Sequence, residues 1–147
     1  MFYGEYSHSI DNKGRLILPS RIREVAQAHF VEKFFVTRGL DTCLFMFTEE
    51  EWRSVEQKFK SMSFTRQDAR HFNRLYFSGA VEAAPDKQGR ILIPNYLKEF
   101  AGIKRDVMIL GVSNRIEIWD KARWEEFYRT NVGAFEATAE KLIDDIS

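Results

Sequence analysis

The sequence predicts an α+β fold, mostly β, in which one unit of order β-β-α-β-β occurs twice in tandem. Three observations support this prediction. The stretch Asp11–Pro19 returns 75 residues later as Asp86–Pro94, with Asp, Gly, Arg and Pro in the same places. The match extends without a gap over residues 2–26 and 77–101, where eight of twenty-five positions are identical. In each copy an alternating apolar pattern changes to helical spacing, as expected for strands followed by a helix.

The first strand expected in each copy precedes the repeated motif. From Phe2 to Ile10 the larger and apolar residues alternate with Glu and Ser. This period of two indicates a half-buried strand. The second copy keeps the pattern from Phe77 to Pro85, through Gly79, Val81 and Ala83, so we expect a strand there too.

The motif itself predicts a turn, a short strand and a helix start. Asp11 to Gly14 has turn composition, and Gly14 is free to take a positive φ. Leu16-Ile17-Leu18 then indicates a short buried strand. Pro19 suits a helix start, because its missing N–H would have no partner there. One face of the helix is expected to be buried through Ile22, Val25, Ala26 and His29, and through Leu97, Phe100 and Ala101 in the second copy.

After the helix the residue offset between the two copies becomes three residues shorter. With this new offset Trp52 aligns with Trp124. Thr48 and Glu51 form a capping-box pattern for a following helix, and Asp120 can cap its counterpart. Two more strands are expected in each copy, at 34–36 and 44–47 in the first and at 107–110 and 116–119 in the second.

Between the units, residues 53–79 carry six Lys or Arg and two acids, a net charge of +4. Thr65 and Asp68 look like another capping box, before a helix with Ala69, Phe72, Leu75 and Tyr76 on one face. The tail from Asn131 to Ser147 has a net charge of −3. Its apolar stripe, expected to dock on its own chain or on a neighbour, is Phe135, Ala139, Leu142, Ile143 and Ile146.

Composition limits the classes of function. The chain has 147 residues with 22 basic and 22 acidic side chains, so any nucleic-acid surface must come from segregated charge. The single cysteine, Cys43, excludes an intramolecular disulfide framework and fits a reducing cytosol. No apolar run approaches the roughly 20 residues that span a bilayer, and the N-terminus lacks a secretion signal. We expect a cytoplasmic protein without a membrane segment.

The repeated Asp-x-x-Gly-Arg motif has two main interpretations. In the structural one, Asp11 and Asp86 accept backbone N–H bonds, Gly14 and Gly89 close the turn, and the arginines pair with the aspartates or cover apolar surface. In the binding one, the doubled cations of loops and helices contact phosphates and guanine edges, where the guanidinium fork can make two parallel bonds. The candidate DNA-binding residues are Lys13, Arg15, Arg23, Lys87, Arg90 and Lys98.

An enzymatic function has the weakest support. His8, His29 and His71 lack metal-ligand spacing, and Cys43 has no partner signature. No Gly-x-Ser-x-Gly, Walker or dinucleotide-binding pattern occurs. We expect no catalytic residue, cofactor, metal or small-molecule substrate, and His29 to be packed in the core.

The chain resembles the MraZ family of bacterial regulators, which belong with the SpoVT/AbrB-like DNA-binding domains. The resemblance covers nearly the whole chain. It is carried by the tandem motifs, the start Met-Phe-Tyr-Gly-Glu-Tyr, the Phe-Ser-Gly-Ala of the second copy, and the region of Trp119 and Trp124. It implies two AbrB-like, swapped-hairpin units that form an intramolecular pseudo-dimer. It also implies that the protein forms a homo-oligomeric ring, which binds promoter repeats of double-stranded DNA upstream of the division and cell wall gene cluster. The protein would then be associated with the nucleoid and act as a repressor.

On this resemblance Arg15 and Arg90 would contact DNA, and Asp11 and Asp86 would shape the loops. The loop lysine is third in the first motif (Lys13) and second in the other (Lys87), so the two halves need not read the same base. The expected division of the chain is 1–52 for the first unit, 53–76 for a helical connector, 77–124 for the second unit and 125–147 for a helical tail.

Two other functions stay open at this point. AbrB-like domains also occur in antitoxins, which bind DNA and a partner protein. A scaffolding oligomer that does not bind DNA would pair its basic loops with its acidic tail.

Overall fold

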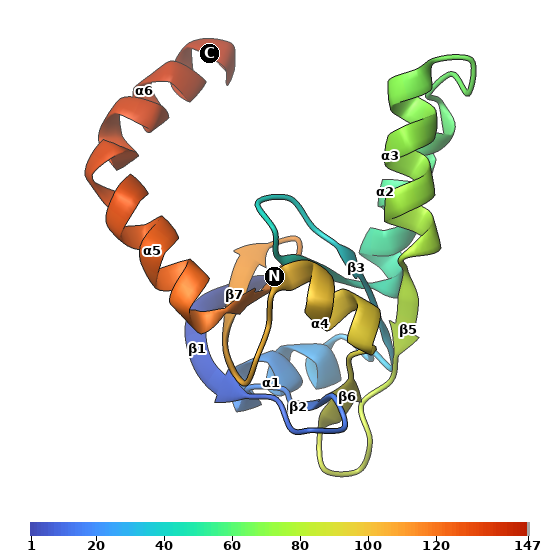
Figure 1. Cartoon of the computed structure of the whole chain (residues 1–147), viewed down its shortest axis with the longest axis vertical. Coiled ribbons are helices and arrows are strands. Elements are labelled where there is room, and N and C mark those ends of the chain that lie inside the picture. Colours follow the sequence, from blue (N-terminus) through green and yellow to red (C-terminus); the bar gives the residue numbers. More distant parts are fainter. Residues whose placement is uncertain (147) are drawn as a thin grey trace.

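The computed structural model describes residues 1–146 (Figure 1). The first copy consists of β1 (Phe2–Ser9), β2 (Arg15–Ile17), α1 (Ser20–Ala28), β3 (Phe34–Arg38), β4 (Leu44–Thr48) and α2 (Glu49–Lys60). After α3 (Gln67–Ser78), the second copy consists of β5 (Val81–Ala83), β6 (Arg90–Leu92), α4 (Asn95–Ala101), β7 (Asp106–Ser113), β8 (Ile116–Asp120) and α5 (Lys121–Asn131). A 3-10 turn, η1 (Val132–Ala134), leads to α6 (Phe135–Ile146). The predicted order β-β-α-β-β, followed by a helix, is confirmed in both copies.

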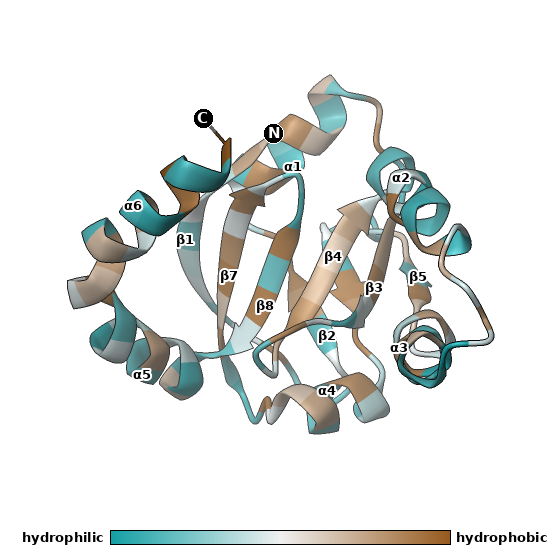
Figure 2. Cartoon of the chain, turned by 90° about the horizontal axis from the view of Figure 1, so that it is seen from above, coloured by the Kyte–Doolittle hydropathy of each residue, from teal (hydrophilic) through white to brown (hydrophobic). Residues whose placement is uncertain are grey.

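Strands of the two copies are interleaved. The six-stranded sheet has the order β1-β7-β8-β4-β3-β5, and all its pairs are antiparallel (Figure 2). The first strand of each copy therefore pairs with the third strand of the other, β1 with β7 and β5 with β3. The swapped arrangement that the family resemblance implies is present within one chain.

A pseudo-twofold axis relates the copies. At the centre of the sheet Phe45 of β4 faces Glu117 of β8, and these two positions correspond in the two copies. β2 and β6 form a separate two-stranded ribbon, in which Leu16 faces Ile91. These two residues also correspond. The axis thus passes through the centre of the sheet and the centre of the ribbon.

The main core lies between the six-stranded sheet and the layer formed by the ribbon, α1 and α4. Leu16, Ile91 and Leu97 are fully buried there, against strand residues such as Phe34 and Ile109. The ribbon is therefore attached to the sheet through its inner side chains.

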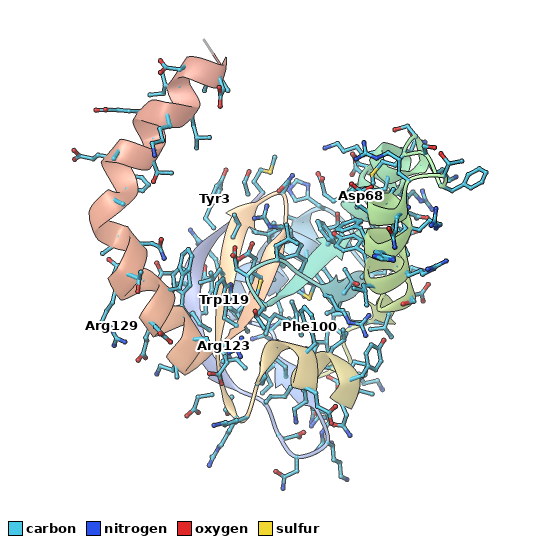
Figure 3. All side chains as sticks on the ribbon, turned by 45° about the horizontal axis from the view of Figure 1, so that its top comes forward. Tyr3, Asp68, Phe100, Trp119, Arg123 and Arg129 are labelled. Atoms are coloured by element: carbon cyan, nitrogen blue, oxygen red, sulfur yellow. The ribbon has the colours of Figure 1, made fainter. Side chains whose placement is uncertain are left out.

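An aromatic cluster covers the opposite face of the sheet. Trp52 of α2 stacks on Phe35 with ring centroids 5.6 Å apart. On the other half, Trp119 of β8 meets Trp124 of α5 at 5.5 Å. Figure 3 shows Trp119 on the sheet beside α5, with the α2–α3 hairpin and Asp68 on the opposite side. Two helical arms thus rise from this face at opposite ends of the sheet, away from the motif loops (Figure 1).

Most of the local predictions are confirmed. Gly14 has φ +83° in its turn. The helices after the motifs begin directly after Pro19 and Pro94. The Thr48 side chain accepts a hydrogen bond from the Glu51 N–H at 3.2 Å, and Asp120 caps α5.

The strand predicted over residues 77–85 is present only as β5, Val81–Ala83; its predicted start at Phe77 is wrong, because α3 continues to Ser78. Phe77 instead joins the aromatic cluster, with its ring 5.5 Å from Trp52. The capping box at Thr65 and Asp68 is also wrong. The residue before α3 is Arg66, and the Asp68 carboxylate accepts from the Ala69 N–H and the Arg66 side chain.

Two side chains expected in the core are exposed. Ile17 lies on the outer face of its strand at 45% exposure, because the alternation of a strand places it opposite to Leu16. His29 follows α1 as its C-terminal cap and is exposed. Leu75, which has the helical spacing of Ala69 and Tyr76, is also exposed on α3.

The tail forms the predicted helix, but no residue of α6 is buried, so it does not dock on its own chain; Ser147 lies outside the described residues. No helix within residues 1–146 is long and apolar enough to cross a membrane.

Two neighbouring residues of the ribbon, Leu16 and Ile17, test which of its faces is buried. Leu16→Ala should lower the free energy of unfolding by roughly 2–5 kcal/mol, since it empties a buried site. Ile17→Ala, one residue later, should cost less than about 1 kcal/mol, because its side chain already meets solvent. Urea unfolding at a fixed protein concentration measures both. Equal losses for the two variants would contradict the assignment.

Candidate functional site

Each motif loop is closed by its aspartate. One carboxylate oxygen of Asp11, Oδ1, accepts from the N–H groups of Lys13 and Arg15, both at 2.9 Å. In the second copy Oδ1 of Asp86 accepts in the same way from Gln88 and Arg90, also at 2.9 Å. The two loops therefore have the same internal hydrogen bonds, and the loop-shaping function expected of the aspartates has a direct structural basis.

The glycines let each loop be held by the other copy. The Gly14 carbonyl accepts from the Ile93 N–H at 2.7 Å, and the Gly89 carbonyl accepts from the Leu18 N–H at 2.9 Å. Gly14 has a positive φ, and a Cβ at this position would overlap the Ile93 carbonyl oxygen. A side chain at residue 14 is thus excluded by backbone of the opposite copy.

Both motif arginines are oriented by the loops. Nε of Arg15 donates to Oδ2 of Asp11 at 2.7 Å, and Nε of Arg90 donates to Oδ2 of Asp86 at 2.9 Å. The pairing anticipated in the structural interpretation of the motif is therefore present. It uses Nε, and within residues 1–146 the terminal Nη nitrogens of both arginines have no hydrogen-bond partner. Each guanidinium is fixed in direction while its forked edge stays available to a ligand.

The hydrogen bonds of the loops lower the pKa of both aspartates. The pKa of Asp11 falls from 3.8 to about 2, first because the Arg15 N–H donates to it and then because the Arg15 side chain does, with a smaller contribution from the Lys13 N–H. The pKa of Asp86 is lowered by the corresponding donors, led by the Arg90 N–H. Both carboxylates are ionised at neutral pH, so each loop keeps its arginine oriented.

The outer face of the ribbon places these arginines side by side. Arg15 pairs with Leu92 and Arg90 with Ile17, so the two arginines are diagonal neighbours, roughly 7–8 Å apart at Cα. Between them lie two aliphatic side chains that meet solvent, Ile17 at 45% and Leu92 at 58% exposure. The exposure of Ile17 and Leu92 was not predicted, because the whole apolar run was assigned to the core. Strict alternation after Arg15 would have identified them.

A cationic groove of about 580 Å³ adjoins this face. Lys98 of α4 lines it together with both motif arginines. Lys104 and Arg105, in the turn between α4 and β7, extend its basic wall. Lys104 and Arg105 were not predicted, because the candidate residues were those that agree between the copies, and the first copy has Glu32-Lys33 in their place. We name the groove together with the ribbon's outer face the basic face.

The remaining sequence candidates have different surroundings. Lys13 and Lys87 are exposed in the loops. Arg23 is half-buried, and its Nε donates to the Leu18 carbonyl at 3.1 Å. It also lines the space beside Gly89. Burial, and secondarily the charge of Arg23, lower the pKa of His8. Arg23 thus supports the second loop from behind, whereas its counterpart Lys98 opens into the groove.

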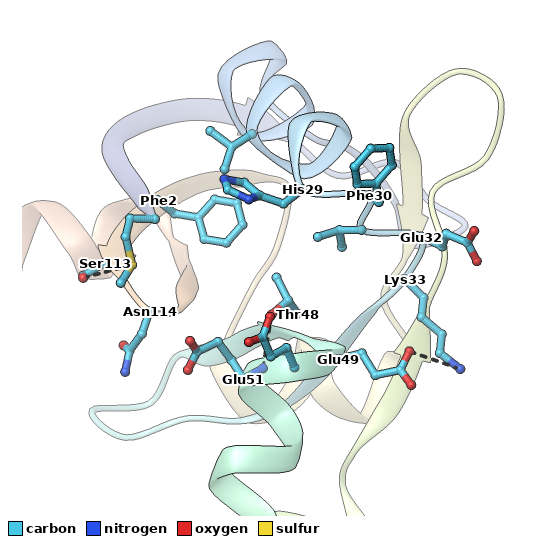
Figure 4. A pocket seen from close by; sticks show the side chains of 14 residues that line it. Phe2, His29, Phe30, Glu32, Lys33, Thr48, Glu49, Glu51, Ser113 and Asn114 are labelled. Atoms are coloured by element: carbon cyan, nitrogen blue, oxygen red, sulfur yellow. Dashed lines mark hydrogen bonds and ion pairs between the residues drawn. The ribbon is translucent and has the colours of Figure 1, made fainter.

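A second hollow, of about 470 Å³, has the opposite charge (Figure 4). His29 and Phe30 form one wall, and Glu49 and Glu51 lie on the facing wall. Glu32 and Glu50 add two further carboxylates. An anionic ligand would be repelled here, so phosphates would be attracted to the basic face and not to this hollow.

The described residues also bear on metal and thiol chemistry. Residues 1–146 contain no group of three or more His, Cys, Asp or Glu side chains that could hold a metal ion. Cys43 is buried, and burial raises the pKa of its thiol far above the usual range. It is thus a poor nucleophile.

Comparison with known proteins gives two matches to the MraZ protein family model, described as antitoxin-like, over residues 1–75 and 76–146. The chain is 51% identical over 144 residues to Transcriptional regulator MraZ of Moorella thermoacetica, with 98% of both chains covered. It is 49% identical over 144 residues to the protein of that name from Carboxydothermus hydrogenoformans, again covering 98% of both. The corresponding protein of Acetivibrio thermocellus is 51% identical over 142 residues, which covers 97% of this chain and 96% of that one.

The loop geometry predicts how Asp11 titrates. Its folded pKa is below 3.8, so the ionised carboxylate stabilises the fold above that pH, and the contribution is lost as the pH falls from 3.8 toward about 2. In Arg15→Ala the pKa should rise only part of the way to 3.8, because the backbone N–H donors remain. Carboxyl chemical shifts followed by NMR give both values. A full return to 3.8 in the variant would show that the side chain, and not the backbone, sets the pKa.

Proposed function

The chain belongs to the MraZ family, and we propose that it is a sequence-specific DNA-binding transcriptional regulator. Its curated relatives carry the name transcriptional regulator. In this proposal it acts as a repressor of the division and cell wall gene cluster, binds promoter repeats as a ring-shaped homo-oligomer, and is located in the cytoplasm with the nucleoid.

The observation that carries the proposal is the outer face of the β2–β6 ribbon. A two-stranded ribbon fits the major groove of B-DNA. Arg15 and Arg90 are held with their forked edges free, as bidentate contact with guanine requires. Ile17 and Leu92 lie between them and provide apolar surface of the kind that contacts thymine methyl groups. We therefore assign base readout to these four residues.

Phosphate contacts would come from the cations around this face. Lys13 and Lys87 extend from the loops, and Lys98, Lys104 and Arg105 line the groove. Such contacts fix the register on the duplex and supply salt-dependent affinity. Because the chain is neutral overall, a single protomer should bind modestly. Asp11, Asp86, Gly14, Gly89 and Arg23 position the loops in this assignment.

Assembly would compensate for the modest affinity of one protomer. Several protomers in a ring that engage spaced repeats raise the apparent affinity through effective concentration, provided that the geometry allows simultaneous binding. In this scheme units 1–52 and 77–124 form the DNA-binding pseudo-dimer. The connector 53–76 and the tail 125–147 are left for contacts between protomers.

A second candidate is an AbrB-like antitoxin that binds DNA together with a toxin. The description of the matched family as antitoxin-like favours it. Co-purification from the native host distinguishes the two. A stoichiometric second protein supports the antitoxin, whereas the chain alone supports the regulator.

Base readout predicts a selective loss of affinity. Arg15→Ala and Arg90→Ala should each weaken binding to the promoter repeats by roughly 1–3 kcal/mol, or about five- to 150-fold, and should affect random DNA much less. Arg53→Ala, an exposed cation on α2, is the matched control and should bind a single promoter repeat like the parent, because binding to one repeat does not depend on contacts between protomers. Fluorescence anisotropy at two salt concentrations measures all three. Parent-like binding of the promoter repeats by both motif variants would refute the assignment.

Lys104 should behave differently because it would contact phosphate. Lys104→Ala should weaken binding to promoter and random DNA alike, and the slope of log K against log salt should become shallower by about 0.9. Titrations from low to moderate salt measure this slope. An unchanged slope would remove Lys104 from the interface.

A further inference from the structure

The two motif loops have the same backbone conformation. In each loop the aspartate carboxylate accepts from the N–H groups of the third and fifth motif residues, at 2.9 Å in all four cases. Gly14 and Gly89, at the fourth position, have φ +83° and +77°. Antiparallel pairing of β2 with β6 places the loops at opposite ends of the ribbon. Residues at equal motif positions are therefore presented in the same way, one at each end.

The second and third motif positions differ between the loops. The first loop has Asn12 followed by Lys13, and the second loop has Lys87 followed by Gln88. Each loop thus contains one lysine and one amide, but in exchanged order. One Asp, one Lys and one Arg give each loop the same net charge of +1. The exchange therefore moves the amide and the charge within the loop and leaves the total charge unchanged.

Neither amide side chain has a role in closing its loop. Asn12 and Gln88 are exposed, and within residues 1–146 neither side chain makes a hydrogen bond. A primary amide donates and accepts hydrogen bonds at the same time. This combination is complementary to the N6 and N7 atoms of adenine in the major groove, whereas an arginine fork is complementary to guanine. Each loop thus adds to its arginine a free group that suits a different base.

The surroundings of the second motif position differ in a matching way. Asn12 lines the basic groove, whose wall in the α4–β7 turn is already cationic. The second loop follows β5, which pairs with β3, and it therefore lies near the turn before β3. The lysine of that turn, Lys33, is bound to Glu82 at 3.2 Å. Lys87 thus brings a cation to the end of the ribbon where the neighbouring lysine is paired, and the amide has the equivalent place at the cationic end.

We propose that Asn12 and Gln88 are specificity-determining residues that read one adenine edge at each end of the ribbon, from different motif positions. Two hydrogen bonds from Asn or Gln to adenine discriminate against the other bases. Because the amides occupy unequal positions, the two adenines would lie at unequal distances from the pseudo-twofold axis. The two halves of the site would then have different preferred sequences. The inference rests on the DNA binding of the proposed function and adds two residues to the four assigned to base readout.

Removal of each amide tests the readout. Asn12→Ala and Gln88→Ala should each reduce the preference for adenine at one base pair of a single promoter repeat, by roughly five- to 150-fold. The slope of log K against log salt should stay that of the parent, because no cation is lost. Gln57→Ala, which removes an exposed amide on α2, is the matched control and should keep every base preference. Competition fluorescence anisotropy with duplexes that each differ at one base pair measures the preferences.

A charge-conserving exchange in the full-length chain tests the positions. Asn12→Lys with Lys13→Gln gives the first loop the order of the second, and Lys87→Asn with Gln88→Lys does the reverse. Each pair should move the preferred adenine in its own half of the site and leave the other half unchanged. The preferred sequences of the two halves should then become alike. The aspartates and glycines are kept, so circular dichroism and melting temperature should match the parent.

The outcomes separate this inference from the proposed function. The inference is overturned if either alanine variant keeps every base preference of the parent, or if the exchanged pairs leave the preferred adenines where they are. If Arg15→Ala loses the preference for the repeat in the same assay, the proposed function stands without the inference. A parent chain that binds the promoter repeat and random DNA alike overturns the proposed function, and the inference with it.

Discussion

β1 pairs with β7 and β5 pairs with β3, so neither copy completes its sheet without the other. The same exchange occurs at the ribbon, where Gly14 and Gly89 each accept a backbone hydrogen bond from the opposite copy. The burial of Leu16 against Ile91 depends on this pairing, and so does the side-by-side placement of the motif arginines. The basic face therefore exists as a product of the interleaving, and disruption of either copy would remove it as a whole.

Interleaving within one chain also lets the two halves differ. At the centre of the sheet the first copy has Phe45 and the second has Glu117, which is buried. Arg115 and the Trp119 indole N–H both donate to the Glu117 carboxylate, at 2.8 and 3.0 Å, and the Arg115 guanidinium lies 4.8 Å from the Phe45 ring. A buried charge at a twofold axis of identical subunits would face its own copy. Here it faces an aromatic ring and is satisfied by two donors.

Much of the fold could be predicted from the sequence because two copies of each pattern constrain one another. The turns, the capping by Thr48 and the strand–helix order are local, and each follows from residue chemistry at short spacing. The strand expected to start at Phe77 does not start there, because Phe77 lies in helix α3 and its ring contacts Trp52. This contact is non-local, so no local sequence pattern indicates it. Ile17 was wrongly placed for a different reason, because the whole run of three apolar residues was assigned to the core and the alternation that starts at Arg15 was not applied to it. At the site, Asp11, Gly14 and Arg15 were identifiable because they recur. Lys104 and Arg105 were not, because they lie where the copies diverge.

The asymmetric groove has a consequence for orientation. A dimer of identical subunits reads a sequence and its reverse complement alike. This chain carries Lys104 and Arg105 on one side of its pseudo-twofold axis, and the corresponding place on the other side has Glu32 and Lys33, the latter bound to Glu82 at 3.2 Å. On the proposed function, the two directions along a DNA site are then not equivalent for one protomer. A promoter repeat would have a polarity relative to the gene that it precedes.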